Sequence, residues 1–275
     1  MTGRNDNGAR WLILLSAGLA LSLTAAFALI FSYVRYRQAR DLYSDAERTY
    51  VRSSVIPGVK TGDAGDTGDQ DEPGLADEDL VNGVPWFELV SVDVDGLRKQ
   101  HNETVGWIYF ENEDISYPVM YSGDNSKYLH TAYTGERSAS GAIFLDGASS
   151  PDLSDTYAII YGHNMRDLSM FGKLKFYRTE EDYYDTHRYF QIFDGEKVYR
   201  YKIFAYAVVR PDHPMYRACG NETADIGAIT ERLRSESIDK TDVEISPSDR
   251  IITLSTCASG GKERMTVSAV RVATH

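Results

Sequence analysis

The chain has 275 residues, a formal net charge of −12 at neutral pH, and 42% hydrophobic residues. That length allows one or two domains with a buried core, and the acidic balance argues against a nucleic-acid partner. The two cysteines lie far apart, and the histidines show no metal-ligand spacing, so we expect no metal and no cofactor.

The first predicted element is a membrane anchor at residues 11–34, which contain no charged residue. As a helix this run would extend about 36 Å at ~1.5 Å per residue, enough to span the hydrocarbon core of a bilayer. A cleaved signal peptide is the alternative, because Ala26-Phe27-Ala28 resembles a cleavage site. The apolar run continues past this point and three arginines follow it, so we favour an uncleaved anchor.

Residues 35–84 are expected to form a juxtamembrane segment and a flexible acidic linker. Residues 35–52 mix charged with apolar side chains and could extend the anchor helix into water. Residues 57–79 are acidic, rich in glycine and without aromatic residues, a composition that cannot bury a core and is typical of a tether. Calcium binding is the alternative, but the aspartates lack the spacing of an EF-hand loop.

Residues 85–275 are predicted to form a single folded domain, mostly β with peripheral helices. Short helices are expected at residues 93–99 and 225–235. Alternating or β-branched runs predict strands at residues 106–110, 143–145, 156–161, 189–193, 198–209, 251–255 and 265–272. Many short strands in one domain indicate a barrel or a sandwich.

Three residues of this domain have the chemistry of a cysteine transferase. Cys257 ends a strand-like run, Arg264 opens the next one, and His163 follows an apolar strand. A neighbouring cation favours the thiolate form of a cysteine, and a guanidinium can stabilise the oxyanion formed on a carbonyl. A histidine can protonate the departing amine.

Each of these residues also has a plainer interpretation. A cysteine at a strand end is commonly a small buried hydrophobe, an arginine there is commonly a surface charge, and a loop histidine commonly has only a structural hydrogen bond. The short separation of Cys257 from Arg264 across a hairpin favours the functional interpretation. The distance in sequence to His163 means that only a structure can show whether the side chains converge.

The run TLSTC at residues 253–257, with Arg264 after it and YGHNM at residues 161–165, resembles the sortases. These are cysteine transpeptidases that attach proteins to Gram-positive cell walls. Further motifs are similar to class B sortases in content and order, namely residues 95–97, 105–108, 115–119, 124–130, 141–146 and 169–171. The resemblance covers residues 86–275 and implies an eight-stranded β-barrel. The loop between Cys257 and Arg264 is shorter than we expect for class B.

The resemblance implies a role for each candidate residue. Cys257 would be the nucleophile, His163 the acid and base, and Arg264 the oxyanion stabiliser. Three further positions, Asn125, Leu129 and Ser255, would border the substrate groove, although they could equally be turn, core and strand residues. Cys219 is interpreted as an incidental thiol. We expect both cysteines to be reduced, because a disulfide would consume the nucleophile.

The implied function is that of a transpeptidase which cleaves a C-terminal sorting signal after Thr through a thioacyl-enzyme. Its partners would be secreted proteins that carry the signal, and the acceptor amine would come from a peptidoglycan precursor or a pilin lysine. The alternatives are a pilin-polymerising sortase, a secreted cysteine peptidase, and a binding module without turnover.

The resemblance also implies the location. It predicts a single-pass protein of the cell membrane, with residues 1–10 in the cytoplasm and the catalytic domain outside. Charge alone does not favour this orientation, because arginines lie on both sides of the span.

Overall fold

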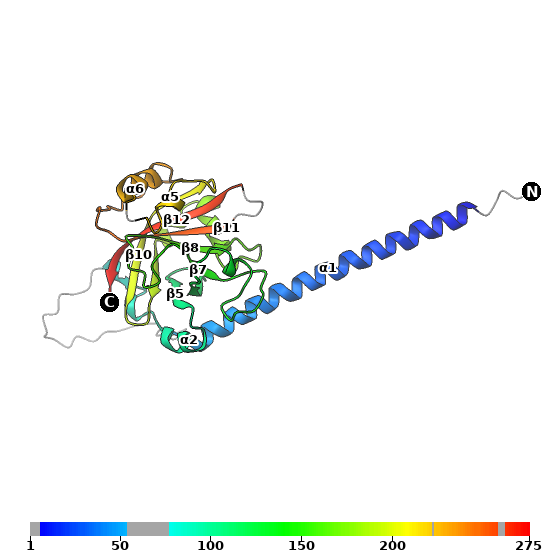
Figure 1. The fold of residues 1–275 in the computed structure, drawn as a ribbon, viewed down its shortest axis with the longest axis horizontal. Helices are drawn as coiled ribbons and strands as arrows, with labels where there is room; N and C mark the ends of the chain where they lie inside the picture. Colours follow the sequence, from blue (N-terminus) through cyan, green and yellow to red (C-terminus); the bar gives the residue numbers. More distant parts are fainter. Residues whose placement is uncertain (1–5, 54–76, 222, 258–261) are drawn as a thin grey trace, which may run out of the picture.

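The computed structural model describes residues 6–53, 77–221, 223–257 and 262–275. A long N-terminal helix, α1 (Asp6–Tyr50), projects from a β-barrel that contains most of the remaining chain (Figure 1). The barrel strands are β5 (Thr104–Phe110), β6 (Ser116–Met120), β7 (Ile143–Leu145), β8 (Tyr157–His163), β9 (Tyr189–Phe193), β10 (Val198–Val209), β11 (Ile251–Cys257) and β12 (Arg264–Thr274).

The eight strands close in the order β10-β12-β11-β8-β7-β6-β5-β9. This confirms the predicted eight-stranded barrel. The pairs β6–β7 and β8–β11 are parallel, and the other neighbouring pairs are antiparallel. Strands β8 and β11 are joined by a long connection, as parallel neighbours require. Because they run in the same direction, His163 and Cys257, at their C-terminal ends, lie at the same end of the barrel.

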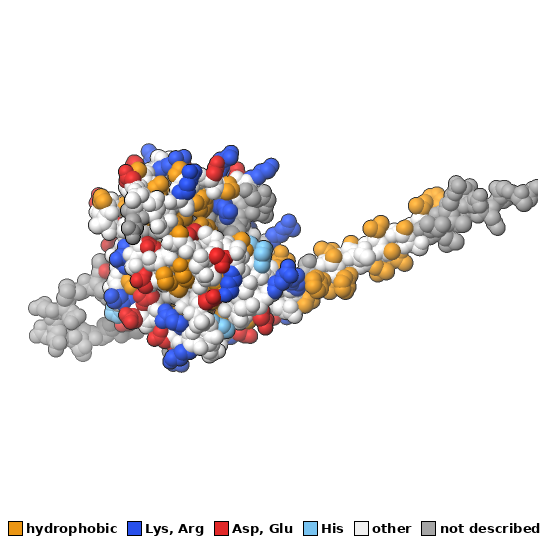
Figure 2. Space-filling model, viewed as in Figure 1, with side chains coloured by type: hydrophobic (Ala, Val, Ile, Leu, Met, Phe, Trp, Pro, Cys, Tyr) orange, Lys and Arg blue, Asp and Glu red, His pale blue; other side chains and the backbone are white. Residues whose placement is uncertain are grey.

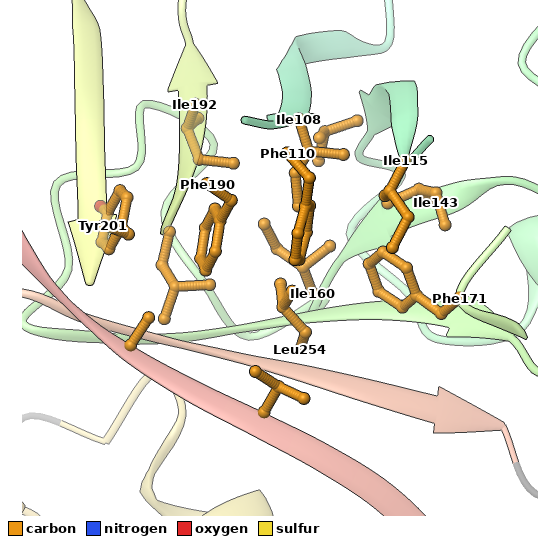
Figure 3. Packing of buried hydrophobic residues seen from close by; sticks show 14 of the residues in the cluster. Ile108, Phe110, Ile115, Ile143, Ile160, Phe171, Phe190, Ile192, Tyr201 and Leu254 are labelled. Atoms are coloured by element: carbon orange, nitrogen blue, oxygen red, sulfur yellow. The ribbon is translucent and has the colours of Figure 1, made fainter. Parts of the chain in front are cut away.

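The barrel interior is filled by aromatic and branched side chains (Figure 3). The ring of Phe190 on β9 stacks with Phe110 of β5 on one side and Tyr201 of β10 on the other, with ring centroids 5.2 Å apart in both pairs. Ile160 and Leu254 face them from β8 and β11 (Figure 3). Each such side chain contributes about 1.5–3 kcal/mol when it is fully buried, so this core fixes the strands that carry the site.

Helices α2 (Val94–Gln100) and α6 (Ile226–Ser235) form where the sequence predicts them. Each begins at an aspartate that accepts a hydrogen bond from a backbone amide three residues later, at 2.8 Å for Asp93 and 2.9 Å for Asp225. The remaining short elements are the helices α3 (Phe176–Thr179), α4 (Tyr183–Thr186) and α5 (Met215–Ala218), the 3₁₀ turns η1 (Asp77–Asp79), η2 (Trp86–Glu88), η3 (Lys127–Leu129) and η4 (Gly172–Lys175), and the strands β1 (Val51–Ser53), β2 (Leu80–Val81), β3 (Val84–Pro85) and β4 (Val90–Val92).

The C-terminal turns of α1 belong to the core of the barrel domain. Tyr43, Ala46 and Tyr50 are only 5%, 2% and 8% exposed, and they share one helix face because they are three and four residues apart. The Tyr43 hydroxyl donates to the Gly141 carbonyl at 2.6 Å. Strand β1 continues directly from the helix and pairs with β4.

Most of the predicted acidic linker lies outside the described residues. The chain contacts the barrel domain on both sides of it, through β1 before and through Glu78 after, whose carbonyl accepts from buried Arg200 at 2.7 Å. The C-terminal part of α1 therefore packs on the barrel domain before the acidic stretch begins.

The opposite end of α1 is exposed and apolar. Within Leu14–Tyr50 the helix has an apolar window long enough to cross a membrane, and no residue of that window is buried. Hydrophobic side chains line the projecting rod (Figure 2). By length and composition this segment is a candidate membrane span.

Candidate active site

The three predicted catalytic positions lie at the ends of three neighbouring strands. His163 is the last residue of β8, and the parallel register pairs it with Cys257, the last residue of β11. Ser255 pairs with Thr266 of β12, and the same antiparallel register continued by two residues aligns Cys257 with Arg264. The side chain of Cys257 lies outside the described part of the chain, so this alignment concerns its backbone alone.

A cavity of about 440 Å³ opens at this end of the barrel. Its wall includes four of the predicted site residues, His163, Arg264, Asn125 and Leu129. Its other lining residues are His130, Phe144, Asp146, Tyr161, Pro211 and Tyr216. The structure therefore gathers side chains from β8, β12 and the segment around η3 about one hollow.

The half-buried His163 ring is oriented by a backbone carbonyl. Its Nε2 lies 2.8 Å from the carbonyl oxygen of Leu129. A carbonyl oxygen only accepts hydrogen bonds, so Nε2 must carry the proton in this contact, and Nδ1 is the nitrogen left to exchange protons. The near-parallel ring of His130 lies 6.5 Å away between centroids.

Arg264 is held by an aromatic ring. Its guanidinium carbon lies 5.7 Å from the ring centroid of Tyr216, within the range of a cation–π contact. The Tyr216 hydroxyl lies 2.9 Å from the hydroxyl of Ser255, which is fully buried. Ser255 therefore does not line the cavity, and it meets the site through Tyr216.

Asp146, another lining residue of the cavity, is buried and orders its neighbours through hydrogen bonds. This carboxylate is 4% exposed and accepts hydrogen bonds from the Tyr161 hydroxyl at 2.8 Å and from Asn125 Nδ2 at 3.0 Å. Asn125 Oδ1 in turn accepts from the Gly147 amide at 2.8 Å. Burial and the neighbouring Asp146 raise the pKa of Tyr161, so its hydroxyl stays protonated and keeps donating.

Sequence reasoning assigned no site role to Asp146, Tyr161 or Tyr216. Asp146 lies in the motif at residues 141–146 that is similar to class B sortases, and Tyr161 opens the YGHNM motif that resembles the sortases; these motifs were the signal that could have found them. Tyr216 lies on α5, in a region with no motif. Its role depends on two partners, Ser255 and Arg264, that lie far along the chain.

Cys219 lies outside the site. It is a free thiol, 6% exposed, with its sulfur 3.0 Å from the Ser149 hydroxyl. Burial raises the pKa of the Cys219 thiol to about 12, so it is protonated at neutral pH and is a poor nucleophile. Across the described ranges, no group of three His, Cys, Asp or Glu side chains gathers closely enough to hold a metal ion.

Comparison with known proteins identifies the family. Residues 108–272 match the family model of the sortase domain. The chain is 31% identical over 239 residues to sortase B of Listeria monocytogenes, a match that covers 87% of this chain and 89% of that protein.

Solved structures agree with this match. A Staphylococcus aureus sortase B–substrate complex has a TM-score of 0.61 at 26% identity, covering 65% of this chain and 84% of that one. A sortase B structure from Bacillus anthracis has a TM-score of 0.67 and covers 87% of this chain and 99% of that one, and at 24% identity it shows the shared fold. Because the family model spans more than half of the sequence, this chain belongs to the sortase family of transpeptidases, in its class B.

Proposed function

We propose that this transpeptidase is anchored in the membrane by α1, cleaves a C-terminal sorting signal after Thr, and transfers the protein to an amine of a cell wall precursor. The observation that carries the proposal is the alignment of His163, Cys257 and Arg264 at the ends of three adjacent strands. Neighbouring strands are ~4.8 Å apart, so the three backbones start within side-chain reach of one substrate carbonyl.

In the first step the Cys257 thiolate attacks the carbonyl carbon of the Thr residue. The C–N bond breaks, a thioester forms on Cys257, and the departing nitrogen takes a proton from His163. Since Nε2 of His163 is engaged with the Leu129 carbonyl, Nδ1 is the nitrogen that gives this proton. Arg264 stabilises the oxyanion of the tetrahedral intermediate.

In the second step an acceptor amine attacks the thioester. The amine loses a proton to His163, the C–S bond breaks, and the Cys257 thiolate is restored as a new amide forms. The fixed Nε2–H bond supports this cycle, because one ring nitrogen remains oriented while the other gives a proton to the leaving amine and later takes one from the acceptor amine.

The sorting signal would lie in the cavity described above. Asn125 and Leu129 line it and would border the bound peptide. Ser255 would act one layer deeper by fixing Tyr216, since its own side chain is fully buried.

We place residues 1–10 in the cytoplasm, residues 11–34 in the membrane and the catalytic domain, residues 85–275, outside the cell. The exposed apolar face of α1 supports the anchor. The family supports the orientation, because sortases act on secreted proteins at the cell surface.

The test uses the full chain in detergent with a panel of Thr-containing sorting peptides and several amines, including a lysine side chain, with products identified by mass spectrometry. A thioacyl adduct on Cys257 that moves to an added amine is expected. The Cys257→Ala variant is expected to form no adduct on any peptide.

Two results would contradict the proposal in different ways. Peptide cleavage at the same rate with and without amine would indicate a cysteine peptidase. An adduct that transfers to lysine and ignores the other amines would indicate a pilin-polymerising enzyme.

A further inference from the structure

A second cavity lies where α1 meets the barrel, and the catalytic mechanism does not use it. It measures about 490 Å³ and is lined from the α1 side by Tyr33, Tyr36, Arg37, Arg40 and Asp41. Arg166 and Asp167, from the loop after β8, complete its wall. Lys and Arg side chains gather at this junction between the apolar rod and the barrel (Figure 2).

The loop side of this cavity is fixed in shape. One carboxylate oxygen of Asp167 accepts from the amide and hydroxyl of Ser169, at 3.2 and 2.7 Å, and the other accepts from Arg40 at 3.4 Å. An isolated antiparallel β-bridge pairs the backbones of Asn164 and Met170 at the base of the loop. Arg166 is therefore presented from a structured turn that is tied to α1.

The cavity has an excess of positive charge. It contains three guanidinium groups and two carboxylates, and one carboxylate, that of Asp167, pairs with Arg40. Within the part of the chain that the structure describes, no carboxylate lies within 4.0 Å of Arg37 or Arg166. Two guanidinium groups are thus available to an anion, in a chain whose formal net charge is −12.

The position of the cavity indicates the kind of anion. It begins at Tyr33, inside the end of the apolar run, and ends at Asp41. These eight residue steps rise about 12 Å along a helix, so from the end of the apolar run they cross the headgroup region, which is about 5–8 Å deep on each side of the hydrocarbon core. Tyrosine at this level is typical of a membrane interface, and guanidinium groups bind phosphate through paired N–H donors.

We propose that this cavity binds the phosphate of an anionic phospholipid headgroup, held by Arg37 and Arg166 and bordered by Tyr33 and Tyr36. The inference rests on the proposed membrane anchor. Bound lipid would join the end of the span to the loop that follows His163, and so would hold the catalytic barrel in one orientation on the membrane surface.

The test compares two full-length double variants in nanodiscs that contain phosphatidylcholine and phosphatidylglycerol, with retained lipids counted by native mass spectrometry. Arg37→Gln with Arg166→Gln removes the two available guanidinium groups. Arg48→Gln with Arg52→Gln removes the same charge from exposed positions farther along the chain. Circular dichroism melting curves establish that both variants are folded.

We expect the first variant to retain phosphatidylglycerol about thirtyfold less than wild type, which corresponds to ~2 kcal/mol, or ~1 kcal/mol for each of the two interfacial arginines removed. The control variant should match wild type. Equal retention in both variants would overturn the lipid site. Displacement of the lipid by inorganic phosphate would overturn it also, by assigning the cavity to a free anion. Release of the chain from membranes by alkaline carbonate would instead overturn the anchor on which the site rests.

Discussion

Tyr216 joins the predicted cation to the strand of the predicted nucleophile. Its ring lies against Arg264 and its hydroxyl meets Ser255, two residues before Cys257. Replacing Tyr216 with Ala removes both contacts and frees the guanidinium. We expect kcat/KM for transpeptidation to fall about tenfold, which corresponds to a cation–π contact of ~1.4 kcal/mol.

Tyr216→Phe and Ser255→Ala provide the matched comparison. Each removes one half of the same hydrogen bond and keeps the ring against Arg264, so both should lose less activity than Tyr216→Ala, and combining them should cost little more than either alone. A Ser255→Ala variant much poorer than Tyr216→Phe would show instead that Ser255 contacts the substrate directly.

The buried thiol of Cys219 offers a prediction on pH. Its pKa is raised to about 12 by burial, whereas an unfolded cysteine has its usual value near ~8.5. The neutral thiol therefore favours the folded state below the unfolded value, and this contribution is lost as pH rises toward 12. In a Cys257→Ala background at pH ~8, iodoacetamide should modify Cys219 only after denaturation. Equally fast labelling of the folded chain would contradict this.

At the residue scale, the sequence identified positions that stand where a strand meets a loop. His163, Cys257 and Arg264 could be named because runs of apolar or β-branched residues end or begin beside them. Asp146 and Tyr216 could not be given roles. Their significance comes from partners on other elements, and no periodicity encodes such contacts.

At the scale of elements, the barrel strands other than β6 could be predicted from alternating or β-branched runs, and the two capped helices from their aspartates. Strand β6 is missing from the predicted set because Pro118 interrupts it. The structure tolerates this proline because β6 pairs with β7 only through Val119 and Met120, beyond the position that lacks an amide hydrogen.

The docking of α1 predicts a difference between two soluble fragments. A fragment of residues 35–275 keeps Tyr43, Ala46 and Tyr50 in the core, and one of residues 81–275 loses them together with β1. Burial of side chains of this size contributes several kcal/mol, so we expect the shorter fragment to melt about 10 °C lower. Thermal unfolding by circular dichroism measures this.

Ala46→Glu in the longer fragment serves as a check, because it places a charge at a position that is 2% exposed against the barrel. It should lower the melting temperature in the same direction. Equal stability of all three proteins would show that α1 packs on the barrel without stabilising it.

At the scale of the whole molecule, composition separated the apolar N-terminus, the acidic stretch and the β domain along the chain. It could not show how they join. An acidic, glycine-rich stretch next to a charged helix suggests a flexible linker. The contact between the helix and the barrel depends on the packing of Tyr43 and Tyr50, which only the structure shows.

Because α1 is continuous, its length sets the distance between the end of the apolar run and the barrel. Nine residues lead from the end of the apolar run at Val34 to the docked Tyr43, about 14 Å of helix. With that run in the bilayer as proposed, this short, continuous stretch of helix would hold the barrel close to the lipid surface. In that arrangement we expect acceptor amines that are still attached to the membrane to react more readily than amines deep in the wall.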